Sequence, residues 1–411
     1  MKKKILFVIN TLGQAGAEKA LLNLISLMDR NDYELYLYVM LSQGELIYDV
    51  PNYVHVLNKH VSPLSVLGKE GEGHLKKEVL KSLVRHGSGI KNASYFLKNF
   101  RRMKKENRIL WDKLLWREVA CGAKRFPMEF DLAVAYLEGA STYYVANYVN
   151  AKKRVAWIHV DMAQAGYDKE LDLDCYEKMD ACFAVSEEVK QSFFQIHPEC
   201  REKTKVFENI LNKKRMQKLS QQGEAKEFDK NSFCILTVGR LHPQKGYELA
   251  IDTMEELKKS SYPIKWYIMG DGPLRKNLEK QIRDRGLEND MILLGAKENP
   301  YPYYLHCDLY VHATLFEGKS IALSEAKYFG VPLVVSDVSG NRLQVKDGEN
   351  GLVCGLSKEE LSSGILRLYK DEALRKQMGE INKKQSASGE NQDIDLLLDI
   401  IKDEQDDSVK I

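Results

Sequence analysis

The sequence has no apolar run of about 18 residues, the length at which a helix could span a membrane. The apolar stretch after Met1 gives way to the polar pair Asn10 and Thr11 too early for a signal peptide. No CxxC pair is present. We therefore expect a cytoplasmic protein, either free or peripheral at the inner face of the plasma membrane. Its seven cysteines are scattered and expected to be reduced thiols: Cys121, Cys175, Cys182, Cys200, Cys234, Cys307 and Cys354.

The sequence also lacks a dinucleotide-binding fingerprint. In the first glycine-bearing turn, "NTLGQAGAEKA" (residues 10–20), Gly13 and Gly16 do not have GxGxxG spacing. The second predicted strand ends in "YVMLS", without an acidic residue for a ribose. A dehydrogenase is therefore disfavoured. The turn could hold an anionic group at a helix N-terminus, although glycines that merely make a tight turn would look the same.

The positive charge of the chain is unevenly distributed. The 411 residues, 44% apolar and 29% charged, are enough for two ordinary soluble domains, and their net charge is only +2. Residues 59–125 nevertheless hold 17 Lys and Arg against 6 Asp and Glu, so this segment carries +11 and the remainder −9. The excess is concentrated where an anionic partner could use it.

Apolar runs typical of buried strands alternate with segments of helical spacing along the whole chain. This alternation predicts α/β architecture, with parallel sheets covered by helices on both faces. We expect two doubly wound, Rossmann-like domains, 1–212 and 231–385, facing across a cleft, with a polar linker at 213–230 and a tail at 386–411. The predicted strands are 3–12, 33–41, 53–58, 131–137, 154–160, 181–186 and 205–209, then 233–241, 264–272, 291–297, 309–315, 332–338 and 351–354.

The stretch "FEGKSIALSEAKYFGVP" (residues 316–332) places two glutamates in apolar surroundings. Glu317 and Glu325 could be an acid/base pair of a glycosidase or the solvated rim of a helix. We expect a helix to begin near Ser320, so that Glu317 lies in a loop and Glu325 in the helix. The free amides of Gly318, Lys319 and Ser320 would then face a ligand. This arrangement favours two grips on a hydroxyl-rich ligand over a hydrolytic pair.

A second charged motif, "VGRLHPQKG" (residues 238–246), follows the first predicted strand of the second domain. Arg240 and Lys245 leave the strand end together, and two cations there suit a diphosphate that gains charge as it departs. Two solvated surface cations are an equally good interpretation of this motif by itself.

Four segments together resemble a known family: "AGAEKALLNLI", "GRLHPQKG", "MGDGPLR" and "FEGKSIALSEAKYFGVPLVVSD". In this order and spacing they are similar to the retaining nucleotide-sugar glycosyltransferases of family four, which have the GT-B fold. Glu317 and Glu325 match the family's E-x7-E signature. "ENPYPYY" (residues 298–304) further resembles the branch that builds bacterial capsule, exopolysaccharide and lipopolysaccharide.

The resemblance implies roles for the matched residues around a nucleotide-sugar donor, with UDP as the expected nucleotide. Arg240 and Lys245 would hold the diphosphate and Glu325 the ribose. Glu317, with the amides of residues 318–320, would grip the sugar. Gly16 would lie against the phosphates or the acceptor.

Two further residues are compared with the family. His159 in "AWIHVD" matches a histidine that the family places beside the sugar ring, although a lone histidine is more often a core residue. Lys319 stands where the family commonly has an aromatic residue, and could meet an acidic sugar, a phosphate or solvent.

No cofactor is expected, because no aspartate pair suits a metal at the diphosphate. Asp172 and Asp174 belong to a predicted helix start, and Asp393 and Asp395 to the tail. The resemblance implies that the departing diphosphate is neutralised by the two cations and the helix N-terminus instead.

The basic segment has two interpretations that the sequence leaves open. In "YFLKNFRRMKKENRILWDKLLWREV" (residues 95–119) apolar residues share one helical face and cations lie largely elsewhere. Such a helix could rest on an anionic bilayer or pack its apolar face within the domain. Lipid-linked acceptors, frequent in the resembled family, favour the membrane. No nucleic-acid-binding motif accompanies the charge.

We therefore predict a retaining, metal-independent glycosyltransferase that transfers a sugar from a nucleotide sugar to a lipid-linked glycan acceptor in cell-surface polysaccharide synthesis. Two alternatives remain. One is a sugar-nucleotide epimerase or phosphorylase on the same fold, and the other is a catalytically silent GT-B subunit that binds a partner transferase or glycan.

Overall fold

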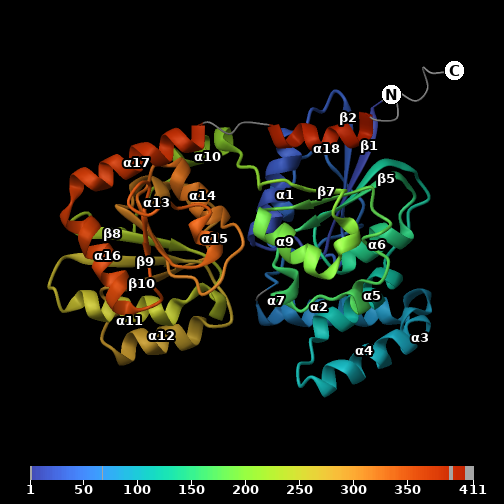
Figure 1. The fold of residues 1–411 in the computed structure, drawn as a ribbon, viewed down its shortest axis with the longest axis horizontal. Helices are drawn as coiled ribbons and strands as arrows, with labels where there is room; N and C mark the ends of the chain where they lie inside the picture. Colours follow the sequence, from blue (N-terminus) through green and yellow to red (C-terminus); the bar gives the residue numbers. More distant parts are fainter. Residues whose placement is uncertain (1, 67, 388–391, 403–411) are drawn as a thin grey trace. The chain divides into compact units, whose positions relative to one another are not determined.

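Two parallel β-sheets organise the protein, one in each of two units of the computed structural model (Figure 1). The structure describes residues 2–66, 68–387 and 392–402. The first unit comprises Met1–Ile210 with Asn391–Ile411, and the second Leu211–Glu390. The predicted strands all form, seven in the first sheet and six in the second.

The first sheet has the strand order β3-β2-β1-β4-β5-β6-β7 and every neighbouring pair is parallel. Parallel strands need crossover connections, which the helices provide. Figure 1 shows helices on both sides of this sheet, with α18 above and α2 and α5 below. The strands are β1 (Lys3–Ile9), β2 (Tyr33–Val39), β3 (His55–Val56), β4 (Phe130–Ala135), β5 (Ala151–Ile158), β6 (Ala181–Ala184) and β7 (Thr204–Val206). The helices are α1 (Gly16–Leu27), α2 (Lys69–Val84), α3 (Ser88–Lys91), α4 (Ala93–Lys105), α5 (Trp111–Gly122), α6 (Ala140–Tyr148), α7 (Met162–Ala165), α8 (Lys169–Asp172), α9 (Glu187–Ile196) and α18 (Gln392–Lys402), with 3-10 turns at Glu45–Asp49, Arg85–Gly87 and Pro198–Cys200.

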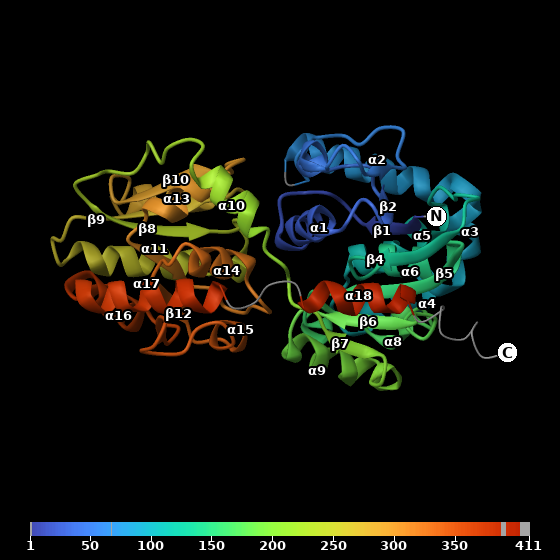
Figure 2. The same ribbon diagram turned by 90° about the horizontal axis from the view of Figure 1, so that it is seen from above.

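The second sheet has the order β10-β9-β8-β11-β12-β13, again all parallel (Figure 2). Along β8, Phe233 and Ile235 enter one core cluster while Cys234 and Leu236 enter another, as the period of two requires. The strands are β8 (Phe233–Val238), β9 (Ile264–Met269), β10 (Met291–Gly295), β11 (Leu309–His312), β12 (Leu333–Ser336) and β13 (Leu352–Cys354). The helices are α10 (Lys213–Ser220), α11 (Tyr247–Lys258), α12 (Arg275–Asp284), α13 (Tyr301–His306), α14 (Ile321–Tyr328), α15 (Ser339–Arg342), α16 (Lys358–Lys370) and α17 (Glu372–Ala387), with a 3-10 turn at Pro243–Lys245.

Helices therefore cover both faces of the second sheet. Side chains of α11, α12 and α16 fill one core cluster, and those of α10, α13 and α14 fill the other. The double winding that the alternation predicts is confirmed in this unit.

The predicted linker and tail differ from the structure. Residues 213–220 form α10, whose Met216 is only 2% exposed in the core of the second unit. A single buried methionine in a polar run gives little periodic signal, so the sequence predicts a linker where the structure has a helix. The tail contains α18, which belongs to the first unit, while the predicted frayed end at 403–411 lies outside the described residues.

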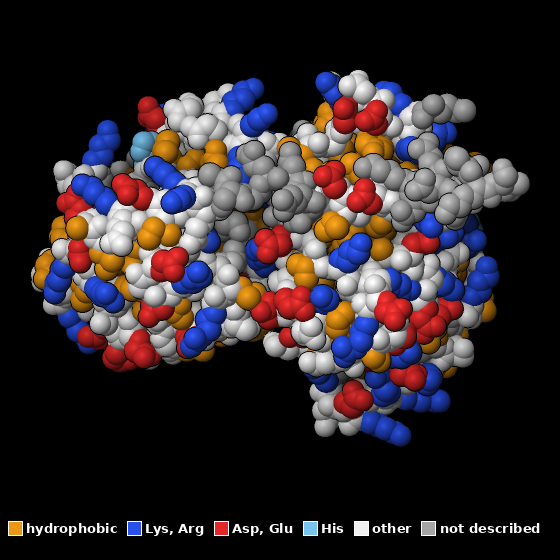
Figure 3. Space-filling model, turned by 45° about the horizontal axis from the view of Figure 1, so that its top comes forward, with side chains coloured by type: hydrophobic (Ala, Val, Ile, Leu, Met, Phe, Trp, Pro, Cys, Tyr) orange, Lys and Arg blue, Asp and Glu red, His pale blue; other side chains and the backbone are white. Residues whose placement is uncertain are grey.

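The basic segment packs largely within the first unit. Residues 95–119 form two helices, α4 and α5, rather than one, with Asn107 at a positive φ of 53° between them. The apolar face of α4 joins a cluster in which Met103, Leu114 and Leu171 are buried. Trp111, by contrast, is 55% exposed. Figure 3 shows Lys and Arg side chains projecting at the bottom of the first unit, where Figure 1 places α4.

Candidate functional site

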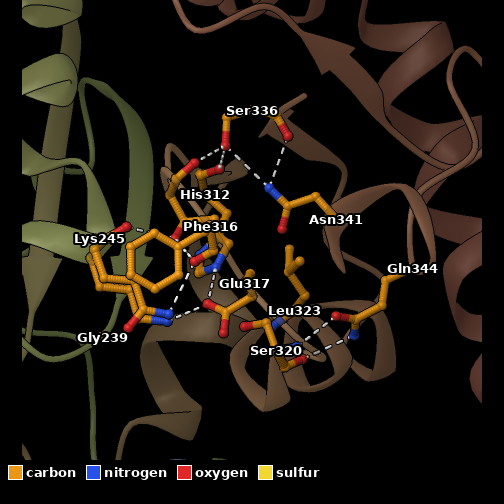
Figure 4. Close-up of polar contacts among 12 residues, drawn as sticks. Gly239, Lys245, His312, Phe316, Glu317, Ser320, Leu323, Ser336, Asn341 and Gln344 are labelled. Carbon is orange, nitrogen blue, oxygen red and sulfur yellow. Dashed lines mark hydrogen bonds and ion pairs between the residues drawn. The ribbon is translucent and has the colours of Figure 1, made fainter. Parts of the chain in front are cut away.

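The carboxyl ends of β8 and β11 bring three polar side chains of the second unit together (Figure 4). Lys245 Nζ forms an ion pair with Glu317 Oε2. The same oxygen accepts a hydrogen bond from His312 Nε2 at 3.2 Å. The three residues come from the turn after β8, the end of β11 and the loop that follows β11. The geometry thus joins the two charged motifs that the sequence shows far apart.

Glu317 stays ionised despite its surroundings. Burial would raise the pKa of Glu317, but the hydrogen bond from His312 and the charge of Lys245 outweigh it and lower the pKa to about 2. Burial, with Lys245 nearby, lowers the pKa of His312. At neutral pH an uncharged His312 therefore donates to a carboxylate, which leaves Lys245 as the cation of the cluster.

Glu325 lies on α14, as predicted, and is 4% exposed. It accepts hydrogen bonds from two tyrosines of α13, Tyr304 at 3.0 Å and Tyr301 at 3.4 Å. Both tyrosines belong to "ENPYPYY", so this motif orients the second signature glutamate. The expected contrast between a loop Glu317 and a helical Glu325 is confirmed.

One expectation about the start of α14 is wrong. The amide of Ser320 is not free, because it donates to Gln344 Oε1 at 2.7 Å. The Ser320 hydroxyl caps the helix by accepting from the amide of Leu323. Both groups of Ser320 therefore serve the local structure, so the predicted ligand-facing role of the Ser320 amide is wrong. Sequence reasoning missed Gln344, since nothing in its spacing ties it to residue 320.

Arg240 follows β8 and is exposed, close to Lys245 in the same turn. Burial lowers the pKa of His242, and the charges of Arg240 and Lys245 lower it further, so both cations lie near this ring. The turn is held by Gly246, whose φ of 64° favours glycine and where a Cβ would lie 2.0 Å from the carbonyl oxygen of Ala313. The structure thus fixes this turn against the strand that precedes Glu317.

In the first unit, His159 follows the carboxyl end of β5. Burial lowers the pKa of His159 to about 3, so the ring is neutral at physiological pH. Its Nε2 is buried and has no hydrogen-bond partner among the described residues. The amides of His159 and Val160 both donate to the carboxylate of Glu138, which is 3% exposed and which sequence reasoning missed.

The predicted glycine turn lies between β1 and α1, with Gly16 as the first residue of the helix. Ala15 at the N-cap has no side-chain oxygen, so it provides no capping hydrogen bond. A Cβ at Gly13 would lie 3.7 Å from a carboxylate oxygen of Glu45, an atom that is itself buried and unpartnered in the described chain. This carboxylate makes the turn less suited to an anion than the glycines alone predict.

The aspartates considered for a metal have other partners. Asp172 is buried and binds Tyr143 at 2.7 Å and His197 at 3.0 Å, while Asp174 pairs with Lys178 at 2.9 Å. Asp395 lies on α18; the side chain of Asp393 lies outside the described residues. Among the described residues no group of three or more His, Cys, Asp or Glu side chains could hold a metal ion. Within the same residues, none of the helices has the length and apolar character needed to cross a membrane.

A family model matches the second unit, and several curated proteins match part of the chain. Residues 220–385 match the family model described as Glycosyl transferases group 1. The chain is 28% identical over 165 residues to an uncharacterized glycosyltransferase of Methanocaldococcus jannaschii, which covers 39% of this chain and 41% of the relative. A second relative is the N-acetylgalactosamine-N,N'-diacetylbacillosaminyl-diphospho-undecaprenol 4-alpha-N-acetylgalactosaminyltransferase of Campylobacter jejuni. The two sequences are 35% identical over 144 residues, and the match covers 34% of this chain and 39% of the relative. The matched segments span about two fifths of the length of these curated relatives.

A solved structure resembles the whole chain. HepE of Anabaena, in complex with UDP-glucose, superposes with a TM-score of 0.65 at 18% identity and covers 98% of this chain and 99% of that one. At this identity the likeness concerns the fold alone, and with the two parallel-sheet units it confirms the predicted GT-B class. The family match confirms the glycosyltransferase resemblance in the part of the chain whose motifs were most specific.

Proposed function

Since residues 220–385 form a Glycosyl transferases group 1 domain, we propose that the protein transfers a sugar from a nucleotide-diphosphate sugar to a glycan acceptor. The observation that carries this proposal is the cluster of Lys245, Glu317 and His312 at the carboxyl ends of β8 and β11, where parallel α/β sheets bind ligands. It supplies a cation for a phosphate beside an ionised carboxylate for sugar hydroxyls.

The roles follow from the chemistry of these groups. An ammonium has three N–H donors, so Lys245 can keep its ion pair with Glu317 and still donate a hydrogen bond to a phosphate oxygen. Arg240, exposed beside it, would share the charge of the departing diphosphate. Glu317 would accept hydrogen bonds from hydroxyl groups of the donor sugar, and Glu325 from those of the ribose. For His159, a place beside the sugar ring stays a prediction.

The proposed reaction retains the configuration at the anomeric carbon. The acceptor oxygen forms its bond to this carbon on the face from which the diphosphate leaves, and the acceptor proton moves to the departing phosphate oxygen. The products are the lengthened glycan and the nucleoside diphosphate. Positioning and stabilisation of the leaving group provide the rate, without a metal in the proposed scheme.

UDP is the proposed nucleotide, and a lipid-linked glycan at the cytoplasmic membrane face the proposed acceptor. The complex of HepE with UDP-glucose supports the first, and the diphospho-undecaprenol in the name of the Campylobacter relative supports the second. Exposed apolar side chains beside the cations of the basic segment also fit a membrane surface: Leu80, Val84, Ile90, Leu97 and Trp111. A UDP-sugar donor and a lipid-linked acceptor both suit cell-surface polysaccharide synthesis.

Ligand-induced stabilisation tests the donor site. A nucleotide that binds the folded protein raises its melting temperature by mass action. We expect UDP and one UDP-sugar to do so in EDTA, and the effect to disappear in Arg240→Ala and Lys245→Ala. The matched control Lys276→Ala changes an exposed cation of α12 and should leave the shift intact. If no nucleotide in a broad panel shifts the wild-type transition, with or without divalent metal, the transferase proposal is wrong.

Transfer and its stereochemistry need a separate assay. The stabilising UDP-sugar is incubated with lipid-linked acceptors, and the anomeric configuration of the product is read by NMR spectroscopy. Conservation of the donor's configuration is the expected result. Turnover of the sugar nucleotide without any glycan product would favour an epimerase or phosphorylase instead.

A further inference from the structure

The loop that carries Glu317 is fastened from a later part of the chain, through Gln344. Gln344 Oε1 accepts the amide of Ser320 at 2.7 Å, and Gln344 Nε2 donates to the carbonyl oxygen of Ser320 and to Ser324 Oγ, both at 2.9 Å. Its side chain reaches across to the start of α14 in Figure 4. A single side chain thus binds both backbone polar groups of one residue, Ser320, at the helix start.

Only an uncharged amide satisfies these contacts. Gln344 is 6% exposed and Ser320 5%, so groups left unpaired there would be cut off from water. A glutamate could accept the Ser320 amide but has no donor for the Ser320 carbonyl, and a leucine could do neither. The site therefore specifies glutamine by chemistry as well as by size.

Gln344 is itself held in place. The backbone carbonyl oxygen of Gln344 accepts hydrogen bonds from Lys327 Nζ at 3.0 Å and from Asn350 Nδ2 at 3.2 Å. Asn350 is 1% exposed, so this anchor is part of the core. The support is therefore rigid enough to transmit its position to residue 320.

The same segment presses on the loop at a second point. A Cβ at Gly340 would lie 2.0 Å from the carbonyl oxygen of Gly318 and 2.2 Å from that of Glu317, so only glycine permits this approach. Next to it, the buried Asn341 donates to the carbonyl oxygen of Ser336 at 2.9 Å, and Ser336 Oγ donates to the carbonyl oxygen of Thr314. Residues 336–344 thus support the Glu317 loop from both sides.

We propose that Gln344 is a positioning residue of the transferase, which sets the place of Glu317 by fixing Ser320. This inference rests on the proposed function. It also explains why the Ser320 amide is not available to the nucleotide sugar. That amide donates to Gln344 and thereby fixes the position of the loop that carries Glu317. Gln344 touches neither of the two cations assigned to the diphosphate, so nucleotide binding and sugar positioning should respond differently to its loss.

The test compares Gln344→Leu and Gln344→Glu with Asn58→Leu. Asn58 is a matched control in the first unit, because it makes the same three contacts: it accepts a hydrogen bond from the amide of Val39 at 2.9 Å and donates to the carbonyl oxygen of Val39 at 2.8 Å and to Ser42 Oγ at 2.9 Å. Displacing a loop by about 1 Å can cost about a hundredfold in rate. We expect kcat per folded molecule to fall at least tenfold in Gln344→Leu, less in Gln344→Glu and not in Asn58→Leu, with the affinity for UDP retained in all three.

Two further readings separate positioning from a general loss of stability. Native-state hydrogen exchange at the Ser320 amide should accelerate in both Gln344 variants but not in Asn58→Leu. The acid limb of the rate profile should also move to higher pH in Gln344→Leu, because a displaced Glu317 loses contact with Lys245 and His312 and its pKa rises. Neither change is expected from a merely structural residue.

The outcomes are distinguishable. Equal activity losses in Gln344→Leu and Asn58→Leu, or unchanged exchange at Ser320, would overturn the positioning role. If Gln344→Leu does not fold, the Gln344→Glu variant provides the test. Full activity in Gln344→Glu would likewise overturn the positioning role. If the wild type does not bind UDP, the proposed function is wrong. The exchange measurement needs no turnover and would still test whether Gln344 fixes the loop.

Discussion

Glu317 is a carboxylate that remains charged where burial alone would neutralise it. Its charge depends on Lys245 and His312, one of which lies 72 positions earlier in the chain. Within the described part of the chain both partners bind the same carboxylate oxygen, Oε2, so Glu317 has oxygen lone pairs to spare for hydroxyl groups. This property suits a residue that grips a sugar, and it can be tested apart from the binding of the nucleotide.

The first prediction concerns Glu317→Gln. Hydrogen bonds to a charged group contribute about 1.5–3 kcal/mol, so we expect the affinity for the UDP-sugar to fall by roughly ten- to a hundredfold. Affinity for UDP alone should change much less, because Lys245 and Arg240 remain. Calorimetric titration with both ligands gives the ratio of the affinity for the UDP-sugar to the affinity for UDP. Glu359→Gln, an exposed glutamate of α16, is the control, and parallel losses for UDP and UDP-sugar would contradict a sugar grip.

The second prediction is the pH dependence of stability that Glu317 imposes. Its pKa falls from an ordinary 4.5 to about 2 in the folded protein, so its contribution is fully present above pH 4.5 and is lost as the pH falls from 4.5 toward 2. A difference of this size corresponds to about 3 kcal/mol. The pKa of His312 is also lowered, which weakens folding in the same direction below its ordinary 6.5.

Denaturation of the second unit at a series of pH values measures this effect. Wild type should lose more of its free energy of unfolding between pH 5 and pH 2 than Glu317→Gln does. The two curves should converge at the acid end, where Glu317 is protonated. Parallel curves throughout the range would show that the carboxylate is not held in its charged form.

At the residue scale the sequence predicted the element of each signature side chain better than it predicted the partners of that side chain. Glu317, Glu325 and Lys245 stand in motifs, and the structure places each in the expected element. His312 and Gln344 do not stand out, because the first reads as the end of an apolar strand and the second as a polar residue of a loop. Their contacts depend on strand order, which local periodicity does not contain.

Element α10 shows how a polar segment can be structural. Only Met216 and Ser220 are buried in this helix, yet Met216 enters a core cluster of the second sheet. Composition averages over the segment and misses one well-packed side chain. The strands were predictable for the opposite reason, because each repeats its apolar signal over several residues.

The third prediction follows from that packing. Met216→Ala should destabilise the second unit by about 2–5 kcal/mol, the range for removing a buried methionine side chain. Hydrogen exchange across the core strands of this unit reports the change without assuming a single unfolding transition. Lys218→Ala, exposed on the same helix, should have almost no effect. A Met216→Ala variant as stable as wild type would restore the linker interpretation.

At the scale of the whole molecule, charge and exposed apolar surface coincide in the first unit. Ser94, Leu97, Lys98, Arg101, Arg102 and Lys105 form one face of α4 and line an open hollow of the surface. Two of these cations are paired, Lys98 with Glu170 and Arg102 with Asp168. Arg101 and Lys105 are exposed and carry the charge most accessible to an anionic surface. Because the apolar face of α4 is used inside the unit, this cationic face is the part that remains for a membrane.

The fourth prediction tests that face in the intact protein. Each cation near an anionic bilayer contributes about 1 kcal/mol, so Arg101→Gln combined with Lys105→Gln should weaken binding to vesicles of anionic lipid by roughly thirtyfold. Sedimentation with anionic and with neutral vesicles provides the measurement, and added salt should weaken the wild-type interaction because exposed charges are screened. Lys276→Gln with Lys280→Gln removes two exposed cations of α12 and should leave binding unchanged. If both double variants bind like wild type, or if wild type binds neutral vesicles equally well, the basic segment serves packing alone and the acceptor must reach the protein without help from membrane charge.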